Sequence, residues 1–388
     1  MTKIVSVFGT RPEAIKMVPV IMELAAHPQN FLSRVCITAQ HRQMLDRVLE
    51  PFGIVPDYDL DIMVSGQDLF DITCNIMNGL KKVLLIEKPD MVLVHGDTTT
   101  TLAASLAAYY LKIPIGHIEA GLRTQNKFAP FPEEINRKLT GVLADLHFAP
   151  TEAARQNLLA EGVSDSVIHV TGNTGIDALL GASSLLNSSA GILHKLDSQF
   201  LYLGTESRLI LVTGHRRENF GDAFENICLA LLDIADRCPD VNIVYPVHLN
   251  PNVQRPVQQI LESAARKNIF LIQPLDYLPF VYLMNRSSII ITDSGGVQEE
   301  APSLGKPVLV MRETSERPEA VNIGTARLVG ASRELIVGET LRLLNNPDAY
   351  KSMSMVHNPY GDGNAAKRIC EILQKQGVGK CQTKIIKP

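Results

Sequence analysis

The feature that most constrains the fold is a series of short, continuous apolar runs, each followed by a polar loop and a segment with helical spacing. Runs that are rich in Val, Ile and Leu along their whole length are typical of parallel strands covered by helices on both faces. The sequence therefore predicts an α/β protein with two Rossmann-like, doubly wound domains. The expected strands are 4–8, 34–38, 90–94, 113–118, 146–149 and 167–170, then 209–212, 243–247, 269–272, 289–291 and 307–310.

The domain boundary is expected where this pattern fades, between about 173 and 206. Small polar residues gather there, as is common between domains. We predict an N-terminal Rossmann-like domain over 1–172, a C-terminal one over 173–358, and a C-terminal helix and tail over 359–388 that packs back on the first domain. Ligands of open α/β sheets bind beyond the carboxyl ends of the strands, so we expect the two domains to face each other across a cleft.

Composition excludes several other classes of protein. The 388 residues include 45% apolar and 20% charged side chains, and the net charge of -4 disfavours nucleic acid as a partner. Six cysteines are scattered without a C-x-x-C pair, which indicates reduced thiols, a cytoplasmic location and no structural zinc. The apolar run at the N-terminus is too short for a signal peptide, and no stretch reaches the length of a membrane span.

An anion site is one interpretation of the stretch Ser294-Gly295-Gly296, which follows an apolar run of strand length. Adjacent glycines allow a ligand to approach the backbone, and free N–H groups at a helix start attract negative charge. Arg11, in the first loop of the other domain, is the candidate cation, and Glu300 is well placed for sugar hydroxyls. The alternatives are a Gly-rich turn capped by Ser294 and a surface arginine.

The sequence motifs that bind common nucleotide cofactors are either absent or do not follow a strand. The nearest match to G-x-G-x-x-G is 361–366, which does not follow a strand, and no P-loop sequence occurs. This disfavours a nicotinamide enzyme and a P-loop kinase. No His, Cys, Asp or Glu set has metal-ligand spacing, and His215 and His248 stand far apart in the chain. The sequence therefore predicts neither a cofactor nor a metal.

Carboxylates follow two successive expected strands, at Asp97 and Glu119, and a third lies at Glu133 in a later loop. Sets of this kind serve reactions that need a base on one face of a carbon and an acid on the other. The alternative for Glu133 is interaction with a helix dipole, because Pro132 and the acidic pair suit a helix N-terminus. The alternative for Lys16, one turn into the first expected helix, is a surface lysine.

Taken together, the sequence resembles the non-hydrolysing bacterial UDP-N-acetylglucosamine 2-epimerases. The resemblance runs from Lys3 to about Leu373 and implies a glycosyltransferase-B type fold, a substrate in the cleft and a homodimer. It also implies interconversion of UDP-GlcNAc and UDP-ManNAc without metal or nicotinamide, supplying ManNAc for cell-surface polysaccharide. The stretches that carry it are 8–16, 95–100, 119–123, 132–134, 214–219, 246–251, 292–302 and 316–319.

The resemblance also implies roles for individual residues. In this family, UDP is eliminated to give 2-acetamidoglucal and then added back, with the proton delivered from the other face. The implied acid/base set is Asp97, Glu119 and Glu133, supported by Lys16 and His215. The implied UDP-binding residues are Arg11, Phe280, Ser294, Gly295, Gly296, Glu300 and Arg317. Positions associated with a second, activating UDP-GlcNAc are Gln40, Gln43, Gln67 and Arg216.

Two other functions use the same features. One is a glycosyltransferase of the same fold with a UDP-sugar donor, which would need an acceptor groove. The other is a non-catalytic UDP-sugar sensor, which would not need Asp97, Glu119 and Glu133. A hydrolysing relative with a fused kinase domain is not expected, because little sequence follows Leu373. Gly66 stands where some activator-dependent members have arginine, which puts strong dependence on an activator in doubt.

Overall fold

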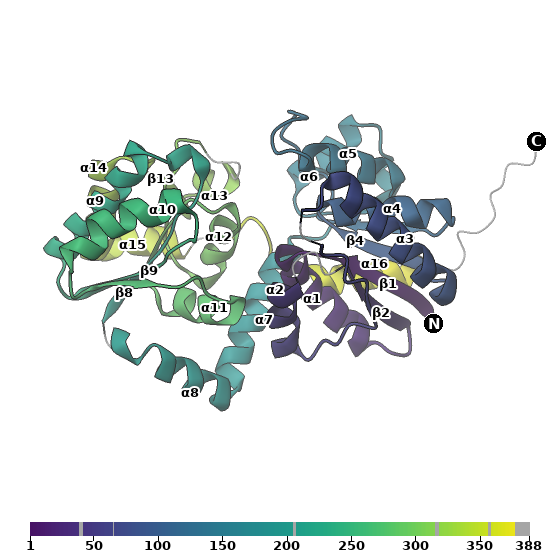
Figure 1. Ribbon diagram of the computed structural model, residues 1–388, viewed down its shortest axis with the longest axis horizontal. Coiled ribbons are helices and arrows are strands. Elements are labelled where there is room, and N and C mark those ends of the chain that lie inside the picture. The colour runs from purple at the N-terminus through teal and green to yellow at the C-terminus, as the bar shows by residue number, and fades with distance from the viewer. Residues whose placement is uncertain (39–41, 65, 205–206, 315–317, 356–357, 377–388) are drawn as a thin grey trace, which may run out of the picture. The chain divides into compact units, whose positions relative to one another are not determined.

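The computed structural model describes residues 1–38, 42–64, 66–204, 207–314, 318–355 and 358–376, with backbone only at 42–44 and 318. The chain forms two compact units (Figure 1). Unit 1 contains Met1–Ala178 and the chain from Tyr360 onward, and unit 2 is Leu179–Pro359.

Unit 1 is built on a parallel sheet with the strand order β3-β2-β1-β4-β5-β6-β7. This order reverses between β1 and β4, as in a Rossmann fold. The strands are β1 Thr2–Phe8, β2 Phe31–Ile37, β3 Tyr58–Asp59, β4 Met91–His95, β5 Ile115–Ile118, β6 Leu146–Ala149 and β7 Ile168–Val170. The helices are α1 Arg11–Ala26, α2 Arg42–Leu49, α3 Leu69–Glu87, α4 Thr99–Tyr110, α5 Glu133–Leu143, α6 Glu152–Ala160 and α16 Ala365–Gln376, with 3-10 turns at Glu50–Phe52 and Asp165–Val167. Helix α7 Thr174–Ser188 begins in unit 1 and continues into unit 2.

Strand β1 divides the core of unit 1 into two layers. Its side chains alternate between the faces of the sheet. Ile4 and Phe8 pack with α1, α2 and α16, whereas Val5 and Val7 pack with α3 and α4. Helices on both faces explain why the strand is apolar along its whole length.

Helix α16 completes the first of these layers, although it lies far away in sequence. Ile369, Cys370 and Leu373 are buried with Met17 of α1 in one apolar cluster. Ala366 N–H also donates to the Asp177 carboxylate on α7 over 2.8 Å, which fixes the start of the helix. The last described helix is therefore part of the core of unit 1.

Unit 2 repeats the same design, with the parallel strand order β10-β9-β8-β11-β12-β13. The strands are β8 Arg208–Thr213, β9 Val241–Pro246, β10 Ile269–Ile272, β11 Ile289–Thr292, β12 Val308–Val310 and β13 Ala326–Leu328. The helices are α8 Ala190–Gln199, α9 Asp222–Arg237, α10 Pro251–Pro256, α11 Tyr277–Arg286, α12 Gly295–Glu300, α13 Pro318–Asn322, α14 Arg333–Asn345 and α15 Pro347–Ser354. Shorter helical turns lie at Leu201–Leu203, Arg217–Asn219 and Ala301–Leu304, and a π-helix at Val257–Glu262.

The prediction of two doubly wound α/β units is confirmed, and each expected strand has a counterpart. The sequence pattern missed β3 and β13, which are too short for an apolar run to be recognised. It also suggested no regular structure between 173 and 206, whereas α7 and α8 occupy most of that stretch. Among the described residues no single helix is long and apolar enough to cross a membrane; α7 and α8 meet that test only as a pair bent by 93°.

Replacing Leu373 by alanine tests the contribution of α16 to unit 1. Leu373 is fully buried, so Leu373→Ala removes apolar contacts and leaves a cavity. We expect the free energy of unfolding of unit 1 to fall by about 2–5 kcal/mol, measured by urea denaturation. Gln374→Ala, at an exposed position of the same helix, is the control and should change it by less than about 0.5 kcal/mol. Equal stability of the two variants would contradict this account.

Candidate active site

The polar residues singled out in the sequence lie at the switch point of each sheet. In unit 1 the loops after β1 and β4 carry Arg11 and Asp97. In unit 2 the loops after β8 and β11 carry His215 and Ser294. The crevice beyond the strand ends at such a point is where open α/β sheets bind ligands.

A buried carboxylate joins the two switch-point loops of unit 1. Glu13 is 2% exposed, and its Oε2 accepts the N–H groups of Gly9 at 3.1 Å and Thr10 at 2.8 Å. Its Oε1 accepts the hydroxyls of Thr98 at 2.6 Å and Thr101 at 3.1 Å, both of which follow β4. Thr10 and Glu13 form a capping box at the start of α1. Glu13 therefore holds the first turn of α1 against the start of α4.

Close packing also fixes the identity of the residue before Thr10. A Cβ atom at Gly9 would lie 2.0 Å from Thr38 Oγ1 and 2.5 Å from Thr100 Oγ1. Those two hydroxyls are 3.1 Å apart and hydrogen-bonded to each other beneath the loop. A side chain at position 9 would separate them, so the loop requires glycine at this point.

Glu119 follows β5 and lies next to two basic groups. Its Oε2 accepts a hydrogen bond from Lys16 Nζ at 2.6 Å and is 2.9 Å from His95 Nε2. Burial would raise the pKa of Glu119, but the charges of Lys16 and His95 outweigh it and hold the pKa well below its usual range. Lys16 is thus an ion-pair partner of Glu119, not the solvent-exposed lysine of the alternative interpretation.

The other two predicted carboxylates lie at the start of α4 and α5. Asp97 follows β4; Arg137 Nε of α5 donates to its Oδ2 at 2.8 Å, and Arg137 Nη2 forms an ion pair with the same oxygen at 2.7 Å. Glu133 is the first residue of α5, which confirms the helix N-terminus expected there. Its Oε2 is buried without a hydrogen-bond partner in the described part of the chain. Asn136 Nδ2 donates to the Asp97 carbonyl at 2.9 Å, which joins α5 to the Asp97 loop.

Unit 2 has its own buried carboxylate at the switch point. Asp293 is fully buried, and its Oδ2 accepts the N–H groups of His215 and Arg216, each at 2.8 Å, and Asn219 Nδ2 at 3.3 Å. Asp293 Oδ1 lies 3.7 Å from His215 Nδ1. The loop after β8 is thereby fixed to the loop after β11.

His215 stacks on His248, with ring centroids 5.1 Å apart and planes inclined by 16°. Burial lowers the pKa of His215; Asp293 opposes that effect and His248 adds to it, so the pKa lies below its usual value. The two histidines are therefore close in space although far apart in sequence. No group of three potential metal ligands occurs among the residues that the structure describes.

The predicted UDP-binding residues of unit 2 lie on α11 and α12. Ser294 is the N-cap of α12 but makes no side-chain capping bond, and a Cβ at Gly296 would meet no atom within 4 Å. Open space and free N–H groups at this helix start suit an anion. Phe280 is half-buried on α11, and Glu300 is the last residue of α12.

The residues predicted for a second ligand are only partly described. Gln40 and the side chain of Gln43 lie outside the described part of the structure, as does Arg317, which was predicted to bind UDP instead. The Gln67 amide bonds to its own loop, donating to the Ile62 carbonyl at 2.7 Å and accepting the Val64 N–H at 3.0 Å. The role assigned to these positions stays a prediction.

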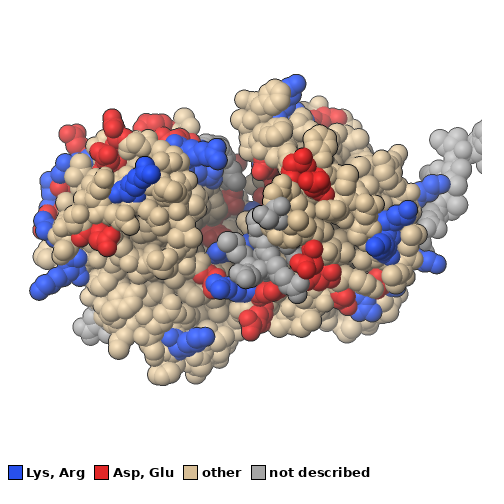
Figure 2. Space-filling model, in the orientation of Figure 1, with Lys and Arg blue, Asp and Glu red and all other residues tan. Residues whose placement is uncertain are grey.

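On the face shown in Figure 2, charged side chains form no single large patch, and both acidic and basic side chains are found on each unit.

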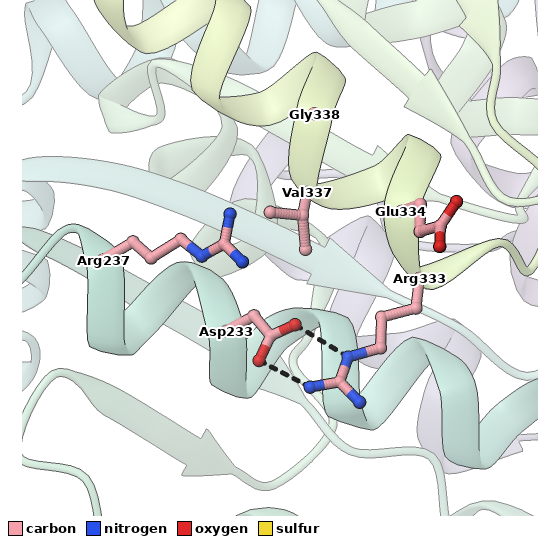
Figure 3. A pocket seen from close by; sticks show the side chains of 6 residues that line it. All are labelled: Asp233, Arg237, Arg333, Glu334, Val337 and Gly338. Atoms are coloured by element: carbon pink, nitrogen blue, oxygen red, sulfur yellow. Dashed lines mark hydrogen bonds and ion pairs between the residues drawn. The ribbon is translucent and has the colours of Figure 1, made fainter.

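A surface pocket between α9 and α14 is lined by Asp233 and Arg333, which form a two-point ion pair with both distances 2.7 Å (Figure 3). Asp233 lies in the last turns of α9, toward the end of the sheet where β9 begins. This pocket is thus remote from the strand ends that carry the candidate residues of unit 2.

Comparison of the sequence with known proteins identifies the family to which the chain belongs. Residues 22–374 match the family model described as UDP-N-acetylglucosamine 2-epimerase. The chain belongs to the UDP-N-acetylglucosamine 2-epimerase family. It is 59% identical to the UDP-N-acetylglucosamine 2-epimerase of Escherichia coli K12 over 376 residues, 97% of this chain and 99% of that protein. The family resemblance predicted from the sequence is therefore confirmed.

Solved structures of 2-epimerases share the fold over almost the full length. The Neisseria meningitidis UDP-GlcNAc 2-epimerase bound to UDP-GlcNAc is 54% identical with a TM-score of 0.87, covering 96% of this chain and 100% of that chain. The Methanocaldococcus jannaschii UDP-GlcNAc 2-epimerase in complex with UDP-GlcNAc and UDP is 34% identical with a TM-score of 0.77, covering 96% and 99%.

Several residues of the candidate site in this 2-epimerase family member were missed by sequence reasoning. Glu13 has a sequence signal, the T-x-x-E spacing of a capping box, but that spacing does not indicate its bonds to the next loop. His95 is the last residue of β4, and its sequence signal is limited to its place in the stretch 95–100, which resembles the family. Arg137 and Asp293 bond to residues 40 and 78 positions away, a relation that no local pattern contains.

Two buried histidines beneath the site make the fold sensitive to acid. His117 on β5 and His147 on β6 are paired across the sheet. Burial lowers the pKa of His117 to about 3 and that of His147 to about 4. Both are neutral in the folded protein at pH values where the unfolded chain, with a pKa near 6.5, binds a proton. Stability is therefore expected to fall as pH drops from about 6.5 toward 4.

The variant His147→Gln tests this linkage. Each such histidine lowers the free energy of unfolding by up to about 1.4 kcal/mol per pH unit across that window. We expect the variant to show a shallower dependence of unfolding free energy on pH between 4 and 6.5, measured by urea denaturation at several pH values. His194→Gln, at an exposed position, should keep the slope of the parent. Identical slopes for parent and His147→Gln would rule out this cause.

Proposed function

We propose that this protein interconverts UDP-GlcNAc and UDP-ManNAc by inverting carbon 2 of the sugar. The observation that carries the proposal is the placing of Asp97, Glu119 and Glu133 at the carboxyl end of one sheet, in a chain of the 2-epimerase family. The Neisseria relative, which binds UDP-GlcNAc, supports the choice of substrate.

The chemistry explains the need for several carboxylates. Carbon 2 has no adjacent carbonyl group, so its proton is not acidic enough for simple removal and return. We infer that the base takes this proton while the bond from carbon 1 to the UDP oxygen breaks, which leaves 2-acetamidoglucal and UDP. Re-addition of UDP then requires a proton donor on the opposite face of carbon 2. A base and an acid on opposite faces are therefore both required.

The environments of the carboxylates suit different roles. Glu119 is held ionised by Lys16 and His95, so it acts as a charged partner and not as the proton donor. Glu133 has a buried oxygen without a hydrogen-bond partner among the described residues, which leaves that oxygen available to a ligand group. Environments that separate the proton affinities of nearby carboxylates are typical of acid/base pairs.

Departure of UDP requires stabilisation of the negative charge that develops on its phosphate. In unit 2, the start of α12 at Gly295 and Gly296 presents N–H groups at the switch point, whereas the Ser294 N–H donates to Thr292 Oγ1 at 2.9 Å. Preorganised donors of this kind stabilise charge that appears in the transition state. In our proposal Glu300 binds the ribose hydroxyls and Phe280 lies against the uracil.

Incubation with UDP-GlcNAc in deuterated water tests the reaction and its route together. The expected product, followed by NMR, is UDP-ManNAc with deuterium at carbon 2, because the proton removed exchanges with solvent before a proton is returned. Free UDP and 2-acetamidoglucal are expected as minor products. An epimer that keeps protium at carbon 2 would exclude the elimination route, and absence of any epimer would exclude the function.

We also propose that the working enzyme is a homodimer that uses the exposed face of α3, α4 and α5. Leu85 and Ile86 of α3 are 50% and 70% exposed, and Tyr109 and Tyr110 of α4 are 58% and 66% exposed. Leu85, Tyr109 and the exposed Val142 of α5 line one surface hollow. A group of large apolar side chains on neighbouring helices is typical of an interface, and a second copy can bury it symmetrically.

The double variant Ile86→Glu/Tyr110→Glu tests this interface. Two carboxylates brought into an apolar contact are costly to bury, so we expect the mass in light scattering to fall from that of two chains to that of one. Val55→Glu places a single carboxylate at another exposed apolar position of unit 1 and should leave the mass unchanged. A parent protein of single-chain mass, or a variant that stays dimeric, would contradict the proposal.

A further inference from the structure

Arg137 contacts one oxygen of the Asp97 carboxylate. Nε donates a hydrogen bond to Oδ2 at 2.8 Å, and Nη2 forms an ion pair with the same oxygen at 2.7 Å. A guanidinium facing a carboxylate commonly pairs with both oxygens. Here the one-sided contact leaves Oδ1 without a partner among the described residues. The two oxygens of Asp97 are thus made unequal by Arg137.

Arg137 is itself fixed by the neighbouring Glu134. Its Nη1 donates to Glu134 Oε2 at 3.1 Å, and the Glu134 side chain is fully buried. The same carboxylate accepts the N–H groups of Thr124 at 3.0 Å and Gln125 at 3.1 Å. Glu134 is saturated by backbone and by Arg137, so the guanidinium has little freedom to turn.

The Asp97 backbone is held by the same helix. Asn136, next to Arg137 on α5, donates to the Asp97 carbonyl at 2.9 Å. Gly96, before Asp97, has a φ of 67°, a conformation that residues other than glycine rarely adopt. Backbone and side chain of Asp97 are therefore set by α5 through two separate contacts, and only the contact with Arg137 acts on the carboxylate.

We propose that Arg137 is a positioning residue that holds Asp97 Oδ2 so that Oδ1 is presented for proton transfer at carbon 2. This rests on the proposed epimerase function. In this proposal Arg137 acts through the orientation of Asp97 and not through a contact of its own with substrate. Misplacing a reacting group by about 1 Å can cost a hundredfold in rate without weakening the binding of substrate. The role predicts a change in kcat with little change in KM.

The variant Arg137→Ala is compared with the parent by steady-state epimerisation of UDP-GlcNAc. We expect kcat to fall by about a hundredfold while KM changes by less than about threefold. Addition of methylguanidinium, the detached head group of arginine, should raise the kcat of this variant at least tenfold. It should not raise the kcat of Asp97→Asn, whose carboxylate is gone. A structural role alone predicts no such rescue.

Arg333→Ala is the matched control, because Arg333 makes an equally short two-point ion pair with Asp233 in a pocket remote from the site (Figure 3). Its kcat should equal that of the parent, with or without methylguanidinium. Should Arg137→Ala fail to fold by circular dichroism, Arg137→Lys replaces it, with the same expected fall in kcat and constant KM. A kcat within threefold of the parent, a parallel rise in KM or absence of rescue in the folded alanine variant overturns the inference. A parent without epimerase activity overturns the proposed function instead.

Discussion

The arrangement of unit 1 depends on the buried carboxylate of Glu13. One of its oxygens accepts N–H groups from the loop after β1, and the other accepts hydroxyls from the loop after β4. These loops flank the point where the strand order reverses, and they carry Arg11 and Asp97. A buried charge is costly unless it is fully hydrogen-bonded, so the four donors must stay in place for the fold to keep it. The fixed positions of these four donors therefore also fix the positions of the two loops.

In unit 2, Asp293 is the buried carboxylate that joins the two loops at the switch point. Its carboxylate lies after β11 and accepts N–H groups from the loop after β8, the equivalent pair of strands. The two carboxylates occupy different places in their units: Glu13 lies in the first helix of unit 1, whereas Asp293 directly follows the fourth strand of unit 2. The common requirement is physical. Parallel strands bring two loops together at the switch point, and their N–H groups need an acceptor.

Much of the fold could be predicted from the sequence because each strand is a local pattern. The runs in β1, β4, β8 and β11 are apolar along their length, and helical spacing follows each one. Strands of two or three residues, such as β3 and β13, carry too little pattern. The helices α7 and α8 were missed because small and polar residues dominate their sequence, and burial of Ile176 and Leu179 within the fold supplies the missing stability.

The site could be predicted only as a set of residue types. Asp97, Glu119 and Glu133 were identified from their places after strands and from the family resemblance. Their partners were not, because an ion pair between Arg137 and Asp97 depends on α5 returning to the end of β4. Lys16 shows the limit well: as an isolated helix residue it resembles a surface lysine, and only the position of Glu119 across the sheet gives it a charge to neutralise.

The return of the chain to unit 1 through α16 has a consequence for the order in which the protein can fold during synthesis. Unit 2 is continuous in sequence and has all of its strands before the chain reaches Tyr360. Unit 1 begins first but lacks Ile369, Cys370 and Leu373 from one core layer until the last helix is made. During synthesis unit 1, which is begun first, therefore completes this core layer only after the strands of unit 2 have been made.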